Sequence, residues 1–339
     1  MHTLYRWPLL LFAALMMTGC GPMTFVVGVT PGDQERDATV VQEAEGWTAD
    51  RVAVIDVSGM IVNGRTPGLL SPGENPVSTF RETLDAAGAD RRVKAVVIRL
   101  NTPGGAVTAS DAMYRDVLRF KQQTGKPVVV LMMDVAASGG YYLACAGDEI
   151  IAYPTTVTGS IGVIIQTVSL QPALSRIGIS TDAITSGPNK DAGSPFGEMT
   201  EGHREVLQGI VDEFYSRFTA VVRERRPNIP AERFAEVTDG RVVSGVAAQE
   251  LGLVDTLGDL DDAFERAKAL AGLSDAKLVV YHREMEYVGS PYASAPGTLG
   301  RAPAAGGQQI NLLQLNLDGS IGGLNAPAGF YYLWQPNLP

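Results

Sequence analysis

The stretch that decides the fold is residues 134–144, DVAASGGYYLA, which lies between two apolar runs. The apolar run over residues 127–133, PVVVLMM, is short and rich in valine, so we expect a buried strand there. The apolar residues from 141 onward predict a buried helix. A strand that turns into a helix at this point holds Ser138 at the carboxyl end of a parallel sheet, where α/β proteins place their active sites.

Ser138 is the single hydroxyl residue between these two runs, and alanine and two glycines flank it. Gly139 and Gly140 can bring backbone N–H groups close to a bound carbonyl, and the new helix adds its positive N-terminal end. Two interpretations stay open from this stretch alone. Ser138 is a nucleophile with an oxyanion donor beside it, or it only caps the helix.

Further strands and helices alternate on the N-terminal side of this turn. A strand is expected over residues 93–100, and helices over 77–87 and 109–123, which predicts an α/β fold with a mainly parallel sheet. The strand over residues 93–100 is followed by the sequence NTPGG, so this turn falls at the same end of the sheet as Ser138. Gly104 or Gly105 can therefore supply a second N–H opposite that of Gly139 and complete an oxyanion hole, unless the two glycines only form a tight turn.

On the C-terminal side, the pattern predicts a strand over residues 181–185 and a loop over 186–196. This loop carries Lys190, one of six lysines in the chain, and from the loop alone a solvated surface lysine is the ordinary interpretation. A long amphipathic helix follows over residues 201–225, and Thr200 is a suitable residue to cap it.

Composition excludes several classes of protein. The chain has 339 residues and a net charge of −10, which argues against nucleic-acid binding. Its two cysteines, Cys20 and Cys145, exclude a disulfide framework and offer no metal site, and we expect Cys145 to be a buried free thiol. The three histidines, His2, His203 and His282, lie in a targeting segment or among polar residues. We expect them to be solvated, so the chain offers no suitable histidine for a Ser-His-Asp triad. The sequence also has no nucleotide-binding or metal-binding motif, so we expect no cofactor.

The chain divides into four expected parts. Residues 1–20 have an apolar core and end in MTGC, which resembles the cleavage site of a bacterial lipoprotein, with Cys20 as the lipidated residue. An ordinary signal peptide and an uncleaved anchor are the alternatives. Residues 21–50 are expected to be a flexible tether, 51–285 a globular domain outside the cytoplasm, and 286–339 a low-complexity tail. This predicts a membrane-anchored protein of the bacterial cell envelope.

Four motifs taken together resemble the signal peptide peptidase A family, peptidase family S49: VKAVVIRLNTPGG, KPVVVLMMDVAASGGYYLA, TGSIGV and NKDAGSP. The resemblance implies a ClpP/crotonase-like fold for the domain over residues 51–285, in the short form with a single repeat. It also implies that Ser138 is the nucleophile and Lys190 the general base. Ser160, in the TGSIGV turn, is expected to orient the Lys190 amine, or else to pack within a tight turn.

This resemblance implies a serine endopeptidase with a Ser-Lys dyad that cleaves remnant signal peptides and other short or unfolded peptides. A lysine acts as a base only when its amine is neutral, which burial by substrate and neighbouring chain favours. In the long relatives, the serine and the lysine lie on different tandem domains. A short chain would reproduce that arrangement by pairing Ser138 of one copy with Lys190 of its neighbour in a homo-oligomeric ring, whereas a dyad within one chain is the alternative.

Two other functions are compatible with such a fold. A crotonase-like enzyme acting on acyl-CoA would share the oxyanion turns but would need a catalytic carboxylate and a basic pocket, which an exported acidic chain makes less suitable. A non-catalytic, membrane-associated scaffold would keep the fold but would not need both Ser138 and Lys190.

Overall fold

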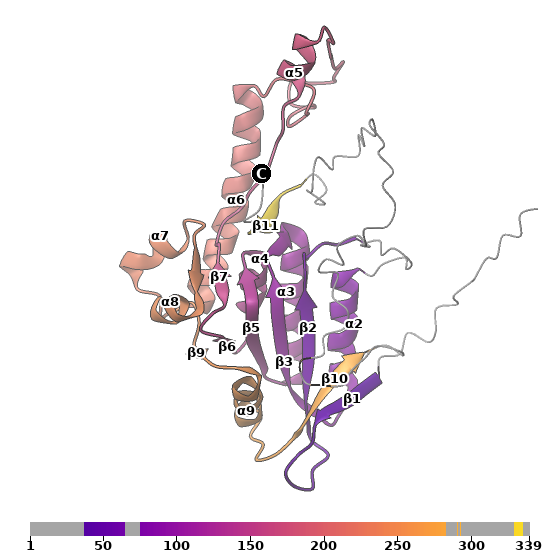
Figure 1. Ribbon diagram of the computed structural model, residues 1–339, viewed down its shortest axis with the longest axis vertical. Helices are drawn as coiled ribbons and strands as arrows, with labels where there is room; N and C mark the ends of the chain where they lie inside the picture. Colours follow the sequence, from indigo (N-terminus) through magenta and orange to yellow (C-terminus); the bar gives the residue numbers. More distant parts are fainter. Residues whose placement is uncertain (1–36, 65–74, 283–289, 291, 293–328, 335–339) are drawn as a thin grey trace, which may run out of the picture. The chain divides into compact units, whose positions relative to one another are not determined.

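A mainly parallel β-sheet with helices on both faces forms the centre of the molecule (Figure 1). The computed structural model describes residues 37–64, 75–282, 290, 292 and 329–334, and within these residues the sheet has nine strands. Along the main path of the sheet, every neighbouring pair is parallel except the first. In sheet order these strands are β1 (Asp37–Gln42), β10 (Lys277–His282), β2 (Arg51–Ser58), β3 (Val93–Thr102), β5 (Val128–Ala137), β6 (Glu149–Ala152) and β9 (Thr256–Leu257). The expected α/β fold is confirmed.

The central strands are buried on both faces, as their continuous apolar sequences predict. Side chains alternate between the faces: Val96 and Ile98 of β3 join one core cluster, whereas Val97 joins the other. The first cluster is covered by α2 (Pro76–Ala89) and α3 (Val107–Thr124), and the second by α9 (Leu260–Leu270). The helices expected over residues 77–87 and 109–123 are thus confirmed.

The end of β5 is the part of the sheet that matters for function. It leads directly into α4 (Gly139–Ala144), as expected. Its last residues pair with the short parallel strand β7 (Val157–Gly159), and β8 (Val242–Ser244) pairs with β7 in turn. Three short helical elements lie near β8 in the sequence: η1 (Ala231–Arg233), α7 (Phe234–Val237) and α8 (Gly245–Glu250).

Residues 164–206, which we call the arm, are exposed along most of their length. The arm contains α5 (Gln171–Arg176) and the first turns of α6 (Glu201–Arg225), which Thr200 caps as predicted. The strand expected over residues 181–185 is wrong, because these residues are exposed and pair with no strand of the described part of the chain. Figure 1 shows α6 running from the helices beside β5 towards α5.

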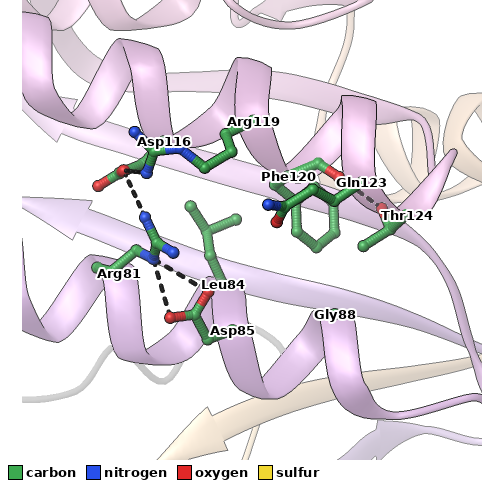
Figure 2. A pocket seen from close by; sticks show the side chains of 9 residues that line it. All are labelled: Arg81, Leu84, Asp85, Gly88, Asp116, Arg119, Phe120, Gln123 and Thr124. Atoms are coloured by element: carbon green, nitrogen blue, oxygen red, sulfur yellow. Dashed lines mark hydrogen bonds and ion pairs between the residues drawn. The ribbon is translucent and has the colours of Figure 1, made fainter.

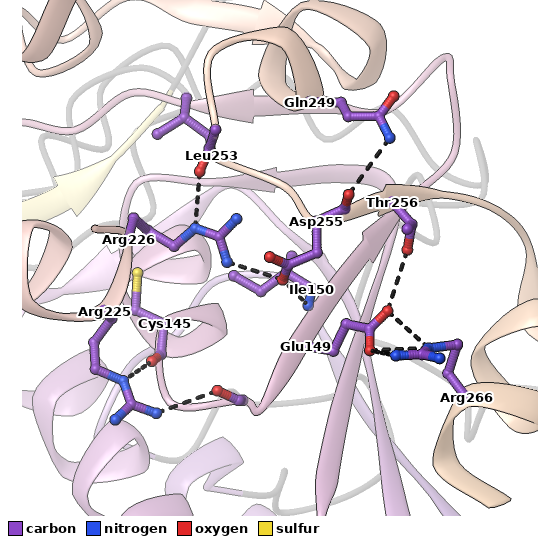
Figure 3. A network of polar contacts seen from close by, with 12 residues as sticks. Cys145, Glu149, Ile150, Arg225, Arg226, Gln249, Leu253, Asp255, Thr256 and Arg266 are labelled. Atoms are coloured by element: carbon purple, nitrogen blue, oxygen red, sulfur yellow. Dashed lines mark hydrogen bonds and ion pairs between the residues drawn. The ribbon is translucent and has the colours of Figure 1, made fainter. Parts of the chain in front are cut away.

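Two arginines fix the C-terminal end of α6 to the segments that lead into β6 and β9 (Figure 3). Arg225 donates to the carbonyl of Cys145, just after α4, at 2.9 Å. Arg226 is 8% exposed and donates to the carbonyl of Gly252 and to the carboxylate of Asp255, each at 2.9 Å. The helix is therefore anchored at this end, while its other end carries the arm.

Two strands lie in segments where we expected a tether and a tail. Residues 37–42, within the expected tether, form β1 and pair antiparallel with β10, because Val40 and its neighbours pack against the core. The short strand β11 (Tyr331–Leu333) pairs antiparallel with β4 (Gly104–Ala106), beside the glycine turn. The expected signal segment with Cys20, and most of the expected tail, lie outside the described residues. Within the described residues, no helix is both long and apolar enough to cross a membrane.

Candidate active site

Ser138 stands in the turn between β5 and α4 in a strained backbone conformation, with φ 52° and ψ −111°. It is 1% exposed, and its Oγ has no hydrogen-bond partner. Although it occupies the N-cap position of α4, its side chain makes no capping hydrogen bond. Strained backbone and unpaired buried polar groups gather at functional sites, so the geometry favours the nucleophile over the helix cap.

The two glycines after Ser138 are required by the packing of the protein itself. A Cβ at Gly139 would overlap Ser110 Oγ, and one at Gly140 would lie 2.7 Å from Thr102 Cγ2. Gly139 is the first residue of α4, and the N–H groups of a first turn have no acceptor inside their own helix. Its N–H is thus available to face a carbonyl beside Ser138.

The second pair of expected donors, Gly104 and Gly105, is already engaged. Gly104 has φ 101° and its N–H donates to Thr102 Oγ1 at 3.1 Å. Gly105 lies between Ile61, with which it forms a parallel bridge, and Tyr332, its partner in the β4–β11 ladder. Either glycine can donate to a bound carbonyl only after one of these contacts opens.

Ser160 lies next to Ser138 because β5 and β7 pair to their last residues. Ala137 is opposite Gly159, and the N–H of Ser138 donates to the carbonyl of Gly159 at 2.8 Å. Ser160 is 7% exposed and has a φ of 52°. Within the described residues, Ser138 and Ser160 are the two non-glycine residues with positive φ, so the strain concentrates at this one place.

Lys190 does not contact Ser138 of its own chain. It is exposed, in a turn that its N–H closes by donating to the carbonyl of Gly187 at 3.2 Å. The loop around it is tied to an earlier part of the arm, where the N–H of Leu170 donates to the carbonyl of Pro195 at 2.7 Å. Because Ser138 Oγ has no hydrogen-bond partner, the structure of one chain leaves the predicted pair apart.

His203 contradicts the prediction that all three histidines are solvated. It is 4% exposed, and its Nε2 lies 2.6 Å from the carbonyl oxygen of Pro188 in the Lys190 loop. The polar residues around it in the sequence pointed to the surface. The capping residue Thr200 places His203 in the first turn of α6, where the Thr200 hydroxyl accepts from the His203 N–H at 3.2 Å, but it does not indicate which way the ring turns.

An aromatic cluster that the sequence did not connect lies beneath the glycine turns. Tyr332 of β11 is fully buried, with its ring centroid 5.2 Å from that of Tyr142 and 4.6 Å from that of Phe218. Its hydroxyl donates to the carbonyl of Phe214 at 3.0 Å. The apolar sequence FYYLW indicates that this segment is buried. It does not identify β4 as the partner, because about 225 residues separate the two segments and such a non-local contact has no local sequence pattern.

Two charged groups on neighbouring helices hold α4 in place. Asp111 of α3 accepts a hydrogen bond from the hydroxyl of Tyr142 and another from Arg217 of α6, both at 2.8 Å. Burial alone would raise the pKa of Asp111, but the hydrogen bonds from Arg217 and Tyr142 outweigh it and hold that pKa below its ordinary value. The carboxylate therefore stays charged and links three helices around the turn that holds Ser138, which we call the serine turn.

Cys145, at the end of α4, is a buried free thiol, as predicted. Burial raises its pKa to about 12, so it is not a nucleophile near neutral pH. Among the described residues, no group of three histidine, cysteine or acidic side chains is placed to hold a metal ion.

A small cavity of about 150 Å³ lies between α2 and α3 (Figure 2). Its charged residues satisfy one another: Arg81 donates to Asp85 and to Asp116, each at 2.8 Å. Arg119 also donates to Asp116, at 2.6 Å. These paired charges therefore belong to the junction between the two helices.

A parallel sheet presents a strained serine and a first-turn glycine at its carboxyl end, and the comparisons place this architecture among the Clp protease-like α/β proteins. A family model described as Clp protease matches residues 68–168, and one described as Peptidase family S49 matches residues 120–274. "Protease 4" of Salmonella typhi is 37% identical over 238 residues, which cover 70% of this chain and 37% of that protein.

Two further relatives show the same relationship. "Putative signal peptide peptidase SppA" of Enterococcus faecium is 32% identical over 240 residues, which cover 71% of this chain and 69% of that protein. "Serine protease SPPA, chloroplastic" of Arabidopsis thaliana is 32% identical over 226 residues, which cover 66% of this chain and 33% of that protein. The chain belongs to peptidase family S49. The aligned region spans little more than a third of the Salmonella protein's length.

Proposed function

We propose that this protein is a serine endopeptidase in which Ser138 is the nucleophile and Lys190 the general base. The neutral Lys190 amine takes the proton of Ser138 while Oγ attacks a peptide carbonyl. The peptide C–N bond then breaks, and the leaving amine takes that proton from Lys190. In the second half, Lys190 takes a proton from water, which attacks the acyl-enzyme, and returns it to Ser138 as the acid product leaves. The observation that carries this proposal is Ser138 itself. It is a buried hydroxyl without a partner, in a strained turn at the carboxyl end of β5.

The negative charge that develops on the carbonyl oxygen needs backbone donors. Gly139 supplies the first, because its N–H follows Ser138 directly and has no acceptor inside α4. Gly104 or Gly105 supplies the second once its present contact with Thr102 or Tyr332 opens. Ser160, held beside Ser138, accepts or donates a hydrogen bond to the incoming lysine amine and orients it.

Lys190, in this proposal, reaches Ser138 of a second copy of the chain. Three observations support a shared site: Ser138 Oγ lacks a partner, Lys190 is exposed, and the arm that carries Lys190 is rich in uncovered apolar side chains. Seven of the twelve exposed large apolar residues in the described part of the chain lie there: Ile164, Val168, Ile177, Ile179, Ile184, Phe196 and Val206. Such patches mark protein interfaces, and a head-to-tail contact that repeats closes a ring.

The proposed substrates are remnant signal peptides and other short or unfolded peptides, since a ring would admit only extended chains. The family membership and the names of the relatives support peptide substrates. We further propose that a lipid on Cys20 attaches the protein to a bacterial membrane with the catalytic domain outside the cytoplasm, a proposal that rests on the sequence of residues 1–20.

A fluorophosphonate probe, which reacts with activated serines, tests the proposal together with a peptide hydrolysis assay. We expect the wild-type protein to be labelled and active, and Ser138→Ala to lose both properties while keeping its circular dichroism spectrum. Lys190→Ala and Lys190→Arg should both lose hydrolysis, because a guanidinium stays protonated and cannot act as a base. Labelling or turnover that persists in Ser138→Ala would contradict the proposal.

A further inference from the structure

The loop that carries Lys190 is fixed by few contacts. Its turns are closed by local backbone hydrogen bonds, such as those from Lys190 to the carbonyl of Gly187 and from Ser194 to that of Asp191. One side of the loop opens onto a cavity of about 350 Å³, lined in part by Pro188 and Asp191, so no packed core supports it there. The position of the Lys190 backbone therefore depends on the few polar side chains that bind the loop.

His203 is the buried side chain that binds it. The residue lies in the first turn of α6, where its N–H donates to Thr200 Oγ1. Since a carbonyl oxygen only accepts, the 2.6 Å contact with Pro188 means that Nε2 carries the hydrogen and donates it. The same Nε2 lies 3.6 Å from a carboxylate oxygen of Asp191, whereas Nδ1 is buried without a partner.

These contacts lie on both sides of the lysine. Pro188 is two residues before Lys190 and Asp191 is one residue after it, so a single imidazole is hydrogen-bonded to the backbone before the proposed base and lies near the side chain that follows it. The imidazole is itself fixed to α6, whose other end is bound by Arg225 and Arg226 to the segments that lead into β6 and β9. A rigid helix thus connects the body of one copy to the lysine loop.

We propose that His203 is a positioning residue: it holds the Lys190 loop against the start of α6 so that the amine is presented in one place to the serine. This inference rests on the proposed role of Lys190 as the base. His203 does not touch the reacting atoms and takes no proton in the reaction. Because a displacement of about 1 Å in a catalytic group can cost about 100-fold in rate, loss of this one contact is expected to act mainly on kcat.

Side-chain geometry offers a matched set of variants. In His203→Gln the amide nitrogen can reach the place of Nε2 and donate to Pro188, whereas in His203→Asn the side chain is one carbon too short. His282→Ala is the control, since His282 lies at the end of β10, where Thr39 contacts it at 2.7 Å, and belongs to no part of the proposed site. If His203→Ala does not fold, the Gln and Asn pair still tests the contact.

The experiment measures kcat and KM on a fluorogenic peptide, and amide hydrogen exchange of residues 186–196, for each full-length variant. We expect kcat to fall by about 10- to 100-fold in His203→Ala and His203→Asn with KM within about twofold, and to stay near wild type in His203→Gln and His282→Ala. Exchange in the loop should rise in the Ala and Asn variants alone.

Exchange that stays unchanged in both His203→Ala and His203→Asn would overturn the inference, as would a His203→Gln variant as slow as His203→Asn. The exchange result is independent of turnover, so it separates this inference from the proposed function. If Lys190→Ala stayed active, the role of Lys190 would fail, while the exchange data would still show whether His203 holds the loop.

Discussion

The backbone N–H of Ser138 donates a hydrogen bond of 2.8 Å to the carbonyl of Gly159. This bond continues the pairing of β5 with β7 by one residue and places Ser138 beside Ser160. Gly159 has φ 85°, and a Cβ there would lie 2.9 Å from the carbonyl oxygen of Arg241, so the position requires glycine. Two strained serines at the ends of neighbouring strands are the structural signature of this site.

Backbone strain at Ser138 predicts a difference between two inactive variants. Both Ser138→Gly and Ser138→Ala remove the hydroxyl, but only glycine adopts a φ of 52° with ψ −111° without strain. We expect the Gly variant to exceed the Ala variant by about 1 kcal/mol in free energy of unfolding. Urea denaturation of the two proteins checks this, and equal stabilities would show that the turn is not strained.

The docking of β11 predicts a large loss of stability in Tyr332→Ala. Truncating this fully buried ring should lower the free energy of unfolding by about 3 kcal/mol, and Tyr332→Phe, which loses only the bond to Phe214, by about 1 kcal/mol. Tyr292→Ala is the control, because Tyr292 is 54% exposed. A Tyr332→Ala variant as stable as wild type would mean that the strand does not dock in solution.

Burial of Cys145 predicts an unreactive thiol. Because its pKa is raised to about 12, alkylation of the folded Cys20→Ser protein should be slow even at pH 9 and fast after denaturation. The raised pKa also means that this residue favours the folded state fully below about pH 8.5, and that the contribution declines as the pH rises from there towards 12. Rapid alkylation of the native protein would contradict the burial.

The proposed lipid on Cys20 predicts that the protein is attached to a membrane. If Cys20 is lipidated, Cys20→Ser should release the protein from membranes or block processing of the precursor. Membrane fractionation and gel mobility measure both effects. A variant that fractionates and migrates like wild type would show that the protein is not a lipoprotein.

The fold and the serine turn could be predicted because local sequence determines them. The valine-rich run before Ser138 and the small residues after it specify a strand, a tight turn and a helix, and Thr200 marks the start of α6 to the residue. Gly139 and Gly140 were predicted to be glycines for the sake of their backbone N–H groups. The structure adds a second reason, because Ser110 and Thr102 pack against them and leave no room for a side chain.

What the sequence could not provide are contacts between distant segments. β11 pairs with β4, and β1 pairs with β10, across more than 200 residues. The sequences of β11 and β1 are too short for their residue pattern to indicate which strand each one pairs with. His203 was placed on the surface because polar residues surround it in the sequence, although the fold turns its ring towards Pro188. The strand expected over residues 181–185 had suitable residues, but among the residues that the structure describes it has no strand to pair with.

The central claim is that a complete site needs Ser138 of one copy and Lys190 of another. Co-expression of two inactive chains, Ser138→Ala and Lys190→Ala, with different affinity tags, allows mixed oligomers to be purified by both tags in sequence. Peptide hydrolysis by these mixed oligomers is the measurement. If the dyad is shared, some interfaces combine both wild-type residues and a fraction of the wild-type turnover returns. If purified mixed oligomers stay inactive while wild-type chains with the same tags are active, the dyad lies within one chain and the claim is wrong.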